Sequence, residues 1–217
     1  MPQSRFALAA CLVLLGTVTR VLPYVLYALG VADISDPNLL PWNVSPMGAI
    51  ALFGGACFSD RRTGFAVILA SLFLGDLGMA LLMKDLSFGF PVLAPVTYGC
   101  FLLMGVLGRW LHAWLQQQSG ALSRVLAIGG TALAGEIVFF VISNFANWVF
   151  QGSYTPDQPP LYPHTPAGLL ACYIAAIPFF GKSLTGMLVY ATALFGGYAL
   201  LQKRAEAPQR ANLAQAH

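Results

Sequence analysis

The stretch SPMGAIALFGGACFSDRR, residues 45–62, is apolar from Ser45 to Phe58 and ends in two adjacent arginines. Ser45 is a favourable N-cap residue, and Pro46 suits the first turn of a helix. The stretch lacks the Gly-Lys-Ser/Thr ending of a phosphate-binding loop. Its glycines and alanines instead fit the close backbone approach of membrane helices. We therefore expect a short membrane helix inside a bundle, and a cavity lined by this helix is the second interpretation.

The composition indicates that most of the protein surface faces lipid. Of the 217 residues, 58% are hydrophobic and 9% are charged, whereas a soluble domain carries about 25% charged residues. The mean hydropathy is +0.71. We expect an all-α polytopic helix bundle, with one integral membrane domain over residues 1–204 and a short polar cytoplasmic tail over residues 205–217. The lipid bilayer is then the main partner, and no nucleic acid is expected.

Six transmembrane helices are predicted from apolar segments of about 20 residues, the length that crosses a bilayer. They are Phe6–Ala28, Leu39–Phe58, Thr63–Met83, Phe90–Leu107, Ala121–Phe150 and Leu184–Leu201. The segment Thr165–Phe180 is short for a crossing and ends in Pro-Phe-Phe. It is therefore predicted to be a re-entrant or interfacial helix, with a seventh span as the alternative.

The basic residues favour six spans with both termini in the cytoplasm. In this topology only Lys84 and Lys182 lie on the outer side. The inner side receives Arg5, Arg61, Arg62, Arg109, Arg124, Lys203, Arg204 and Arg210. Such an excess of Lys and Arg is typical of cytoplasmic loops. An odd number of spans would move the C-terminal basic residues outside and weaken the pattern.

Three ionisable residues, Arg20, Asp76 and Glu136, lie inside the predicted spans. Charged groups are costly in a bilayer, so each is a candidate functional residue. At 1.5 Å per residue, each lies about 20 Å from the inner end of its span. We expect the three to share one layer in the outer half of the membrane. The alternative is an ion-pair network in which Arg20 neutralises one acid and only holds helices together.

Helical periodicity adds polar and aromatic residues to this layer. At about 100° per residue, Tyr24 and Tyr27 share a stripe with Arg20. The helix face that carries Glu136 also carries Phe140, Ser143, Asn144, Asn147 and Gln151. The predicted substrate-binding residues are Arg20, Tyr24, Tyr27, Trp42, Asn43, Asp76, Glu136, Asn144, Asn147 and Trp148. For each tryptophan alone, the aromatic belt at the membrane surface is the favoured interpretation.

Enzymatic and metal-binding functions have little support in the sequence. Neither HExxH nor GxSxG occurs in it, and these are motifs of metalloproteases and hydrolases. The four cysteines form no CxxC pair, and the three histidines are far apart along the chain, so no ligand spacing is present. We therefore expect no enzyme activity, no cofactor and no metal ion. An intramembrane enzyme that uses Asp76 or Glu136 is the least favoured alternative.

Several motifs resemble those of a known family. They are RVLPY, PWNVSPMGAIALFGGACFSDRR, LGD, NFANWVF, YPHTPAGLLACYIAAIPFF and LVYATALFG. From about Arg20 to Gly197, the chain resembles an uncharacterised bacterial six-span membrane family described as transport proteins. More remotely, its layout is similar to that of the S-components of energy-coupling-factor vitamin transporters. Pro46 and Asp76 match the proline-led second span and the acid near the end of the third span in that group.

The chain departs from the pattern of the family that it resembles at three places. Tyr24 stands where members usually have a histidine, and Met187 stands where they often have an acid. Residues 28–40 form a loop that members usually lack. If these positions contact the ligand, the ligand of this chain is expected to differ from that of the other members.

The resemblance and the layer of charged residues together imply a function in transport. The chain would be an S-component-like subunit that binds a small polar or vitamin-like solute from the outer side. The sequence has no nucleotide-binding motif, so ATP energy would come from a coupling subunit and the ATPases of an energising module. The alternative is a structural or assembly subunit of the membrane whose buried charges hold its helices together.

Overall fold

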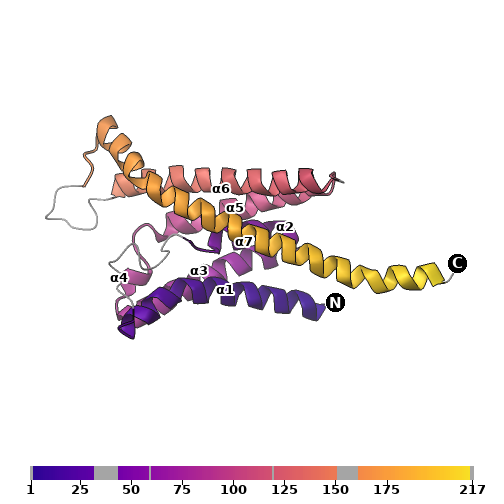
Figure 1. Ribbon diagram of the computed structural model, residues 1–217. Coiled ribbons are helices and arrows are strands. Elements are labelled where there is room, and N and C mark those ends of the chain that lie inside the picture. Colours follow the sequence, from indigo (N-terminus) through magenta and orange to yellow (C-terminus); the bar gives the residue numbers. More distant parts are fainter. Residues whose placement is uncertain (1, 32–43, 59, 119, 151–160, 216–217) are drawn as a thin grey trace.

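A computed structural model describes residues 2–31, 44–58, 60–118, 120–150 and 161–215. Within these residues every regular element is an α-helix, so the predicted all-α helix bundle is confirmed (Figure 1). The helices are α1 (Pro2–Ala28), α2 (Met47–Cys57), α3 (Arg61–Met83), α4 (Leu86–Gly89), α5 (Ala94–Leu115), α6 (Ala121–Phe150) and α7 (Pro166–Gln215).

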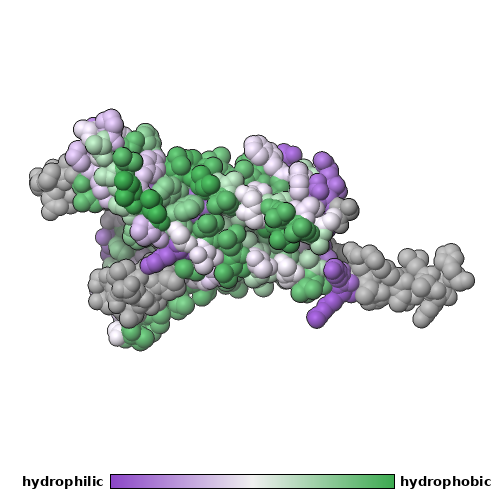
Figure 2. Space-filling model, turned by 45° about the horizontal axis from the view of Figure 1, so that its top comes forward, coloured by the Kyte–Doolittle hydropathy of each residue, from purple (hydrophilic) through white to green (hydrophobic). Residues whose placement is uncertain are grey.

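Five helical segments of the described chain are long and apolar enough to cross a membrane. They are Arg5–Ala28, Arg61–Met83, Leu86–Leu115, Ala121–Phe150 and Pro166–Arg204. Figure 2 shows hydrophobic residues over most of the face between the two ends of the bundle, and hydrophilic residues at the end from which α7 projects. These features indicate a membrane-spanning protein, since about 20 apolar helical residues cross the hydrocarbon layer.

The short helix α2 occupies the centre of the bundle. It contacts α3, α5, α6 and α7, and ten of its 11 residues are buried. A helix of 11 residues is about 16 Å long, roughly half the thickness of a bilayer core. Positions 39–43 of the predicted span Leu39–Phe58 lie outside the described residues. In the rest of this span, the helix covers only Met47–Cys57.

The start of α2 differs slightly from the prediction. Pro46 is the N-cap residue and the helix begins at Met47, one position later than expected. Ser45 still serves this end, because its Oγ accepts a hydrogen bond from the backbone N–H of Met47 at 3.2 Å. The Pro46 carbonyl accepts the first helical hydrogen bond, from Ile50 N–H at 2.8 Å.

Glycines let α2 approach its neighbours at backbone distance. A Cβ atom on Gly55 would overlap the backbone carbonyl of Gly105 in α5, and one on Gly108 would overlap the carbonyl of Leu52. Arg109 closes the other end of α2, because its guanidinium donates to the carbonyl oxygen of Phe58 at 2.9 Å. Carbonyl groups at a helix C-terminus lack intrahelical donors, so Arg109 holds α5 against this end.

The last helix corrects one prediction. The segment 165–180 is not a separate re-entrant or interfacial helix, because α7 runs without a break from Pro166 to Gln215. Pro178 lies inside this helix, where membrane helices tolerate proline when neighbouring groups satisfy the freed carbonyl. Residues 205–215 of the predicted polar tail continue the same helix. The N- and C-terminal ends of the chain lie at the same end of the bundle (Figure 1).

The other predicted spans agree with the helices to different degrees. The span Ala121–Phe150 coincides with α6, and Thr63–Met83 ends with α3. The first helix begins four residues before the predicted Phe6. The fourth predicted span, Phe90–Leu107, lies inside the apolar helical segment Leu86–Leu115, and its bounds differ from those of α5, which covers Ala94–Leu115. Residues 86–89 form the separate short helix α4, and α5 extends through Arg109, which the prediction had placed beyond the span.

We expect the residues at the beginning of α3 to make the stability of the protein depend on pH in the acidic range. The Asp60 carboxylate accepts hydrogen bonds from the Thr63 hydroxyl at 2.9 Å and from the backbone N–H groups of Thr63 and Arg62. These bonds, led by that of the hydroxyl, lower the pKa of Asp60 below its usual value. Its stabilising contribution is therefore present above the pKa of the unfolded chain and is lost as the pH falls through the lower folded pKa.

The pH effect can be measured by thermal unfolding in a nonionic detergent between about pH 5 and pH 3, around the usual pKa of aspartate. The Asp60→Asn variant keeps a capping side chain that does not titrate. Its unfolding temperature should fall less than that of the wild-type protein across this range. Equal losses in the two proteins would contradict the assignment.

Candidate functional site

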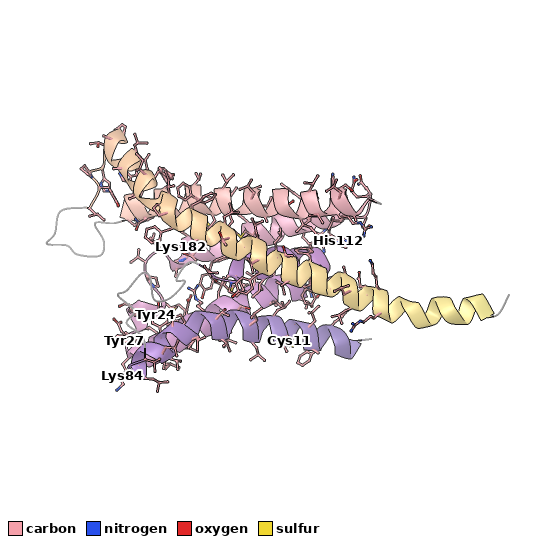
Figure 3. All side chains as sticks on the ribbon, in the orientation of Figure 1. Cys11, Tyr24, Tyr27, Lys84, His112 and Lys182 are labelled. Carbon is pink, nitrogen blue, oxygen red and sulfur yellow. The ribbon has the colours of Figure 1, made fainter. Side chains whose placement is uncertain are left out.

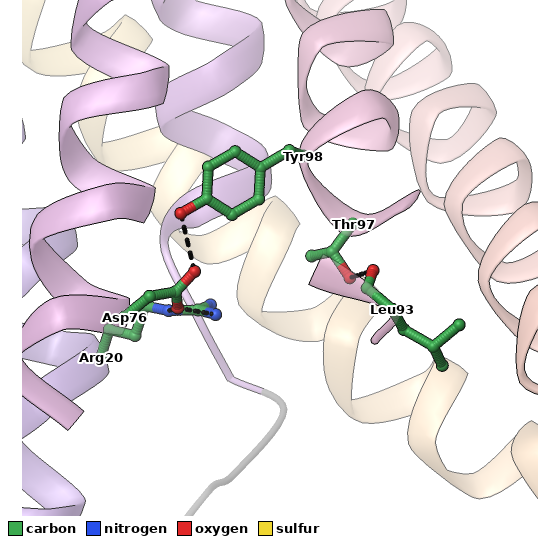
Figure 4. Close-up of polar contacts among 5 residues, drawn as sticks. All are labelled: Arg20, Asp76, Leu93, Thr97 and Tyr98. Carbon is green, nitrogen blue, oxygen red and sulfur yellow. Dashed lines mark hydrogen bonds and ion pairs between the residues drawn. The ribbon is translucent and has the colours of Figure 1, made fainter. Parts of the chain in front are cut away.

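Two of the three predicted charged residues form an ion pair between α1 and α3. Arg20 Nε donates to Asp76 Oδ1 at 2.7 Å, and a second guanidinium nitrogen contacts the same oxygen. The hydroxyl of Tyr98 in α5 donates to Asp76 Oδ2 at 2.8 Å (Figure 4). Asp76 is only 1% exposed. Three helices therefore meet at this carboxylate, and the charge of Arg20 is neutralised within the bundle.

The third charged residue, Glu136, is not part of this ion pair. It is 4% exposed, and the hydroxyl of Ser183 in α7 donates to its Oε2 at 2.7 Å. Its Oε1 lies against Gly48 of α2, where an added Cβ atom would come within 2.9 Å. Within the described residues, the salt bridge joins Arg20 to Asp76 and does not include Glu136. In that part of the chain, the Glu136 carboxylate thus has a hydroxyl donor and no basic partner.

A cavity of about 330 Å³ lies between the helices beside Glu136. We call it the Glu136 cavity. Its lining comprises Arg20, Ser45, Gly48, Thr97, Phe101, Glu136, Phe139, Phe140, Ser143, Asn144, Ala176, Phe179, Phe180 and Ser183. The volume falls at the lower end of the range for small-molecule sites. The lining combines aromatic rings with hydroxyl, amide and charged groups, as such sites usually do.

The Glu136 cavity lies toward the end of the bundle opposite the chain termini. Arg20 lies in the last third of α1, and Thr97 is in the first turn of α5. Asn144 lies two turns beyond Glu136 along α6, about 12 Å further toward that end. The charged layer predicted from the sequence therefore corresponds to Arg20 and Glu136 at the wall of one cavity, with Asp76 buried behind Arg20.

The other predicted site residues are placed as follows. Asn144 lines the cavity, and its amide Nδ2 donates to the carbonyl of Phe140 at 2.8 Å. Asn147, one turn further, contacts Cys172 Sγ at 4.0 Å and does not line the cavity. Trp148 donates from Nε1 to the carbonyl of Pro163 at 3.0 Å, which joins the end of α6 to the segment before α7.

The two predicted tyrosines also lie outside the cavity wall. Tyr24 packs edge-on against Phe88 of α4, with ring centroids 5.4 Å apart, and Tyr27 is 43% exposed. Figure 3 shows both at the same end of the bundle as Lys84. Trp42 and Asn43 lie outside the residues that the structure describes.

Sequence reasoning missed several residues of the cavity and its support. Tyr98 and Ser183, which bind the two acids, were not among the predicted site residues. Phe140 and Ser143 had been placed on the helix face of Glu136, and this periodicity was the signal that could have included them. Phe179 and Phe180 were assigned to a helix break, although α7 carries both into the cavity lining.

The side chains around the cavity are suited to contacting a small molecule rather than to coordinating a metal ion. No group of three or more His, Cys, Asp or Glu side chains with suitable geometry occurs among the described residues. The polar groups around the cavity are a carboxylate, hydroxyls and an amide, which can orient a small molecule. The aromatic rings supply most of the remaining surface.

Comparison with known proteins gives the chain a family without an assigned activity. No curated protein and no solved structure matches it. The resemblance to S-components therefore has no support from these comparisons, and the description as a transport protein stays a prediction. A model of one family's sequences matches residues 1–210, nearly the whole chain. The chain belongs to this family, a family of unknown function (DUF6580).

Proposed function

We propose that the protein is a membrane transport protein that binds a small polar or vitamin-like solute in the Glu136 cavity. The observation that supports this proposal most is a buried carboxylate at the wall of a 330 Å³ cavity. Ionisable groups inside membrane bundles are costly and are found mainly where they bind or move a solute. Arg20 and Asn144 add hydrogen-bonding groups to the same wall.

The proposed topology places the solute site on the outer side of a bacterial inner membrane. Both chain termini lie at one end of the bundle (Figure 1), and the cavity lies toward the other end. The excess of basic residues near the termini favours the cytoplasm for that end. A solute would therefore enter from the outside. Energy for translocation would come from a coupling subunit and its ATPases, as in the S-component systems that the sequence resembles.

One observation favours a structural or assembly role as the second candidate. The Arg20–Asp76 pair and the Tyr98 hydroxyl connect three helices, and the Ser183–Glu136 bond connects α7 to α6. These contacts stabilise the bundle whether or not a solute binds. The two candidates differ in one measurable respect, since only a binding protein needs the cavity to be open.

The test fills the cavity without removing any polar group. Ala176 lines the cavity, whereas the neighbouring Ala175 is exposed on the outer surface of α7. The Ala176→Phe variant should lose the small molecules that the gently purified wild-type protein retains, because the ring occupies their space. The Ala175→Phe variant is the matched control and should retain them. Mass spectrometry of the retained compounds is the measurement.

Thermal unfolding of the three proteins completes the experiment. Similar unfolding temperatures with loss of the compound only in Ala176→Phe support the solute cavity. Retention of the same compound by Ala176→Phe, or failure of the wild-type protein to retain any compound, would favour the structural role.

A further inference from the structure

The charges around the Glu136 cavity do not balance within the described residues. Arg20 reaches the cavity wall, but its guanidinium is already paired with Asp76. Glu136 has the Ser183 hydroxyl as its donor. Lys182, which precedes Ser183, is exposed and is not part of the cavity lining. The Arg20–Asp76 pair is neutral as a whole, so the carboxylate of Glu136 is the unbalanced charge at the cavity wall.

The carboxylate is held in place by three helices. Ser183 of α7 bonds one oxygen, and the other oxygen lies over Gly48 at the start of α2. The sulfur atoms of Met104 and Met187 also lie close to the position of a Cβ on Gly48. These neighbours are apolar and cannot neutralise a negative charge. A buried carboxylate without a cationic partner is costly, so a positively charged ligand is the one that this position favours.

The walls of the cavity are suited to an organic cation rather than to a metal ion. Five phenylalanines from α5, α6 and α7 contribute to the lining: Phe101, Phe139, Phe140, Phe179 and Phe180. Aromatic rings attract organic ammonium groups through their faces, most strongly where water is excluded. A metal ion needs several oxygen or nitrogen ligands, and the described residues place one carboxylate here.

We propose that the Glu136 cavity binds a small organic cation, an amine or a quaternary ammonium compound. Its positive charge lies at the Glu136 carboxylate, and its apolar part lies against the phenylalanine rings. Hydroxyl or amide groups of the ligand are oriented by Ser143 and Asn144, two turns from Glu136 along α6. This inference rests on the proposed function, because it names the chemical class of the solute.

Three probes of nearly equal shape separate charge from size. They are (2-hydroxyethyl)trimethylammonium, its neutral isostere 3,3-dimethylbutan-1-ol, and the anion 3,3-dimethylbutanoate. Binding is measured by isothermal titration calorimetry in a nonionic detergent at millimolar probe concentrations. The cation should bind the wild-type protein at least about tenfold more tightly than the neutral probe. The anion should bind most weakly, because Glu136 repels it.

Two variants assign the preference to Glu136. Glu136→Gln keeps the shape and an oxygen that can accept the Ser183 hydrogen bond, and it should lose the preference for the cation over the neutral probe. Asp85→Asn removes an exposed carboxylate at the start of α4, and this control variant should still prefer the cation over the neutral probe. Binding of the neutral probe to Glu136→Gln shows that this variant is folded, and an unchanged unfolding temperature is a second check.

The outcomes distinguish this inference from the proposed function. The proposal of an organic cation is overturned if the neutral or anionic probe binds as tightly as the cation or more tightly. It is also overturned if the cation does not bind, or if Glu136→Gln keeps the preference for the cation. If Ala176→Phe still abolishes retention of a compound in that case, the solute cavity stands and only the ligand class is wrong. If no probe binds and no compound is retained, both proposals fail.

Discussion

Replacing Asp76 by alanine is expected to lower the free energy of unfolding by about 3–5 kcal/mol, which is the usual cost of removing one partner of a buried ion pair. The change leaves the Arg20 guanidinium without its carboxylate and the Tyr98 hydroxyl without its acceptor. The Tyr98 hydroxyl lies between packed helices, and the Arg20 side chain is 26% exposed and lines the Glu136 cavity, so water replaces the lost partner only in part. Titration with sodium dodecyl sulfate in mixed micelles measures the change.

A double variant separates the ion pair from the space that it fills. Arg20→Met combined with Asp76→Leu removes both charges and keeps most of the volume, so it should recover much of the stability. Asp85→Asn, which removes an exposed carboxylate but keeps a side chain that can cap α4, serves as the control and should stay close to the wild-type protein. An Asp76→Ala variant within about 1 kcal/mol of the wild-type protein, as for an exposed pair, would contradict the interpretation.

The second large effect is expected at the contact between α2 and α5. A methyl group added by Gly55→Ala would overlap the backbone carbonyl of Gly105, and no rotation of a side chain can relieve this overlap. The two helices must separate, which loosens the packing around the centre of the bundle. We expect a loss of about 3 kcal/mol or more, at the upper end of the usual cost of overpacking.

A glycine on an outer face provides the matched control for this substitution. At Gly129 in α6, an added Cβ atom meets nothing within 4 Å. Gly129→Ala should therefore be neutral, or should stabilise the helix by up to about 1 kcal/mol because alanine favours helix formation. The same titration measures both variants. Equal effects at Gly55 and Gly129 would show that α2 and α5 are not held at backbone distance.

The helices could be predicted well where a long apolar segment has clear ends. The segment Ala121–Phe150 begins directly after Gly120, and its predicted bounds match α6. The prediction failed at Pro178, because a proline that ends a helix in water is tolerated inside a membrane bundle. The predicted start of the fourth span also differs, because α5 begins at Ala94 rather than at Phe90.

The candidate site could be predicted only in part from the sequence. Residue depth along each span was enough to associate Arg20 with Glu136, and both line the same cavity. Which acid pairs with Arg20 depends on the neighbours of each helix, and spacing along the chain does not contain that information. Tyr98 was missed for the same reason, since only the packing of α5 against α3 brings its hydroxyl to Asp76.

The unbroken helix α7 runs from the Glu136 cavity to the end of the bundle at which α1 begins. Phe180 lines the cavity and Arg204 lies toward the far end of the same helix, roughly 36 Å away along the axis. Because an α-helix is stiff along its length, a rotation at one end displaces the other end. A tilt of about 5° around the cavity would move the backbone at Arg204 by about 3 Å. A tilt of α7 around the Glu136 cavity would therefore displace the opposite end of this helix without unfolding any of its turns.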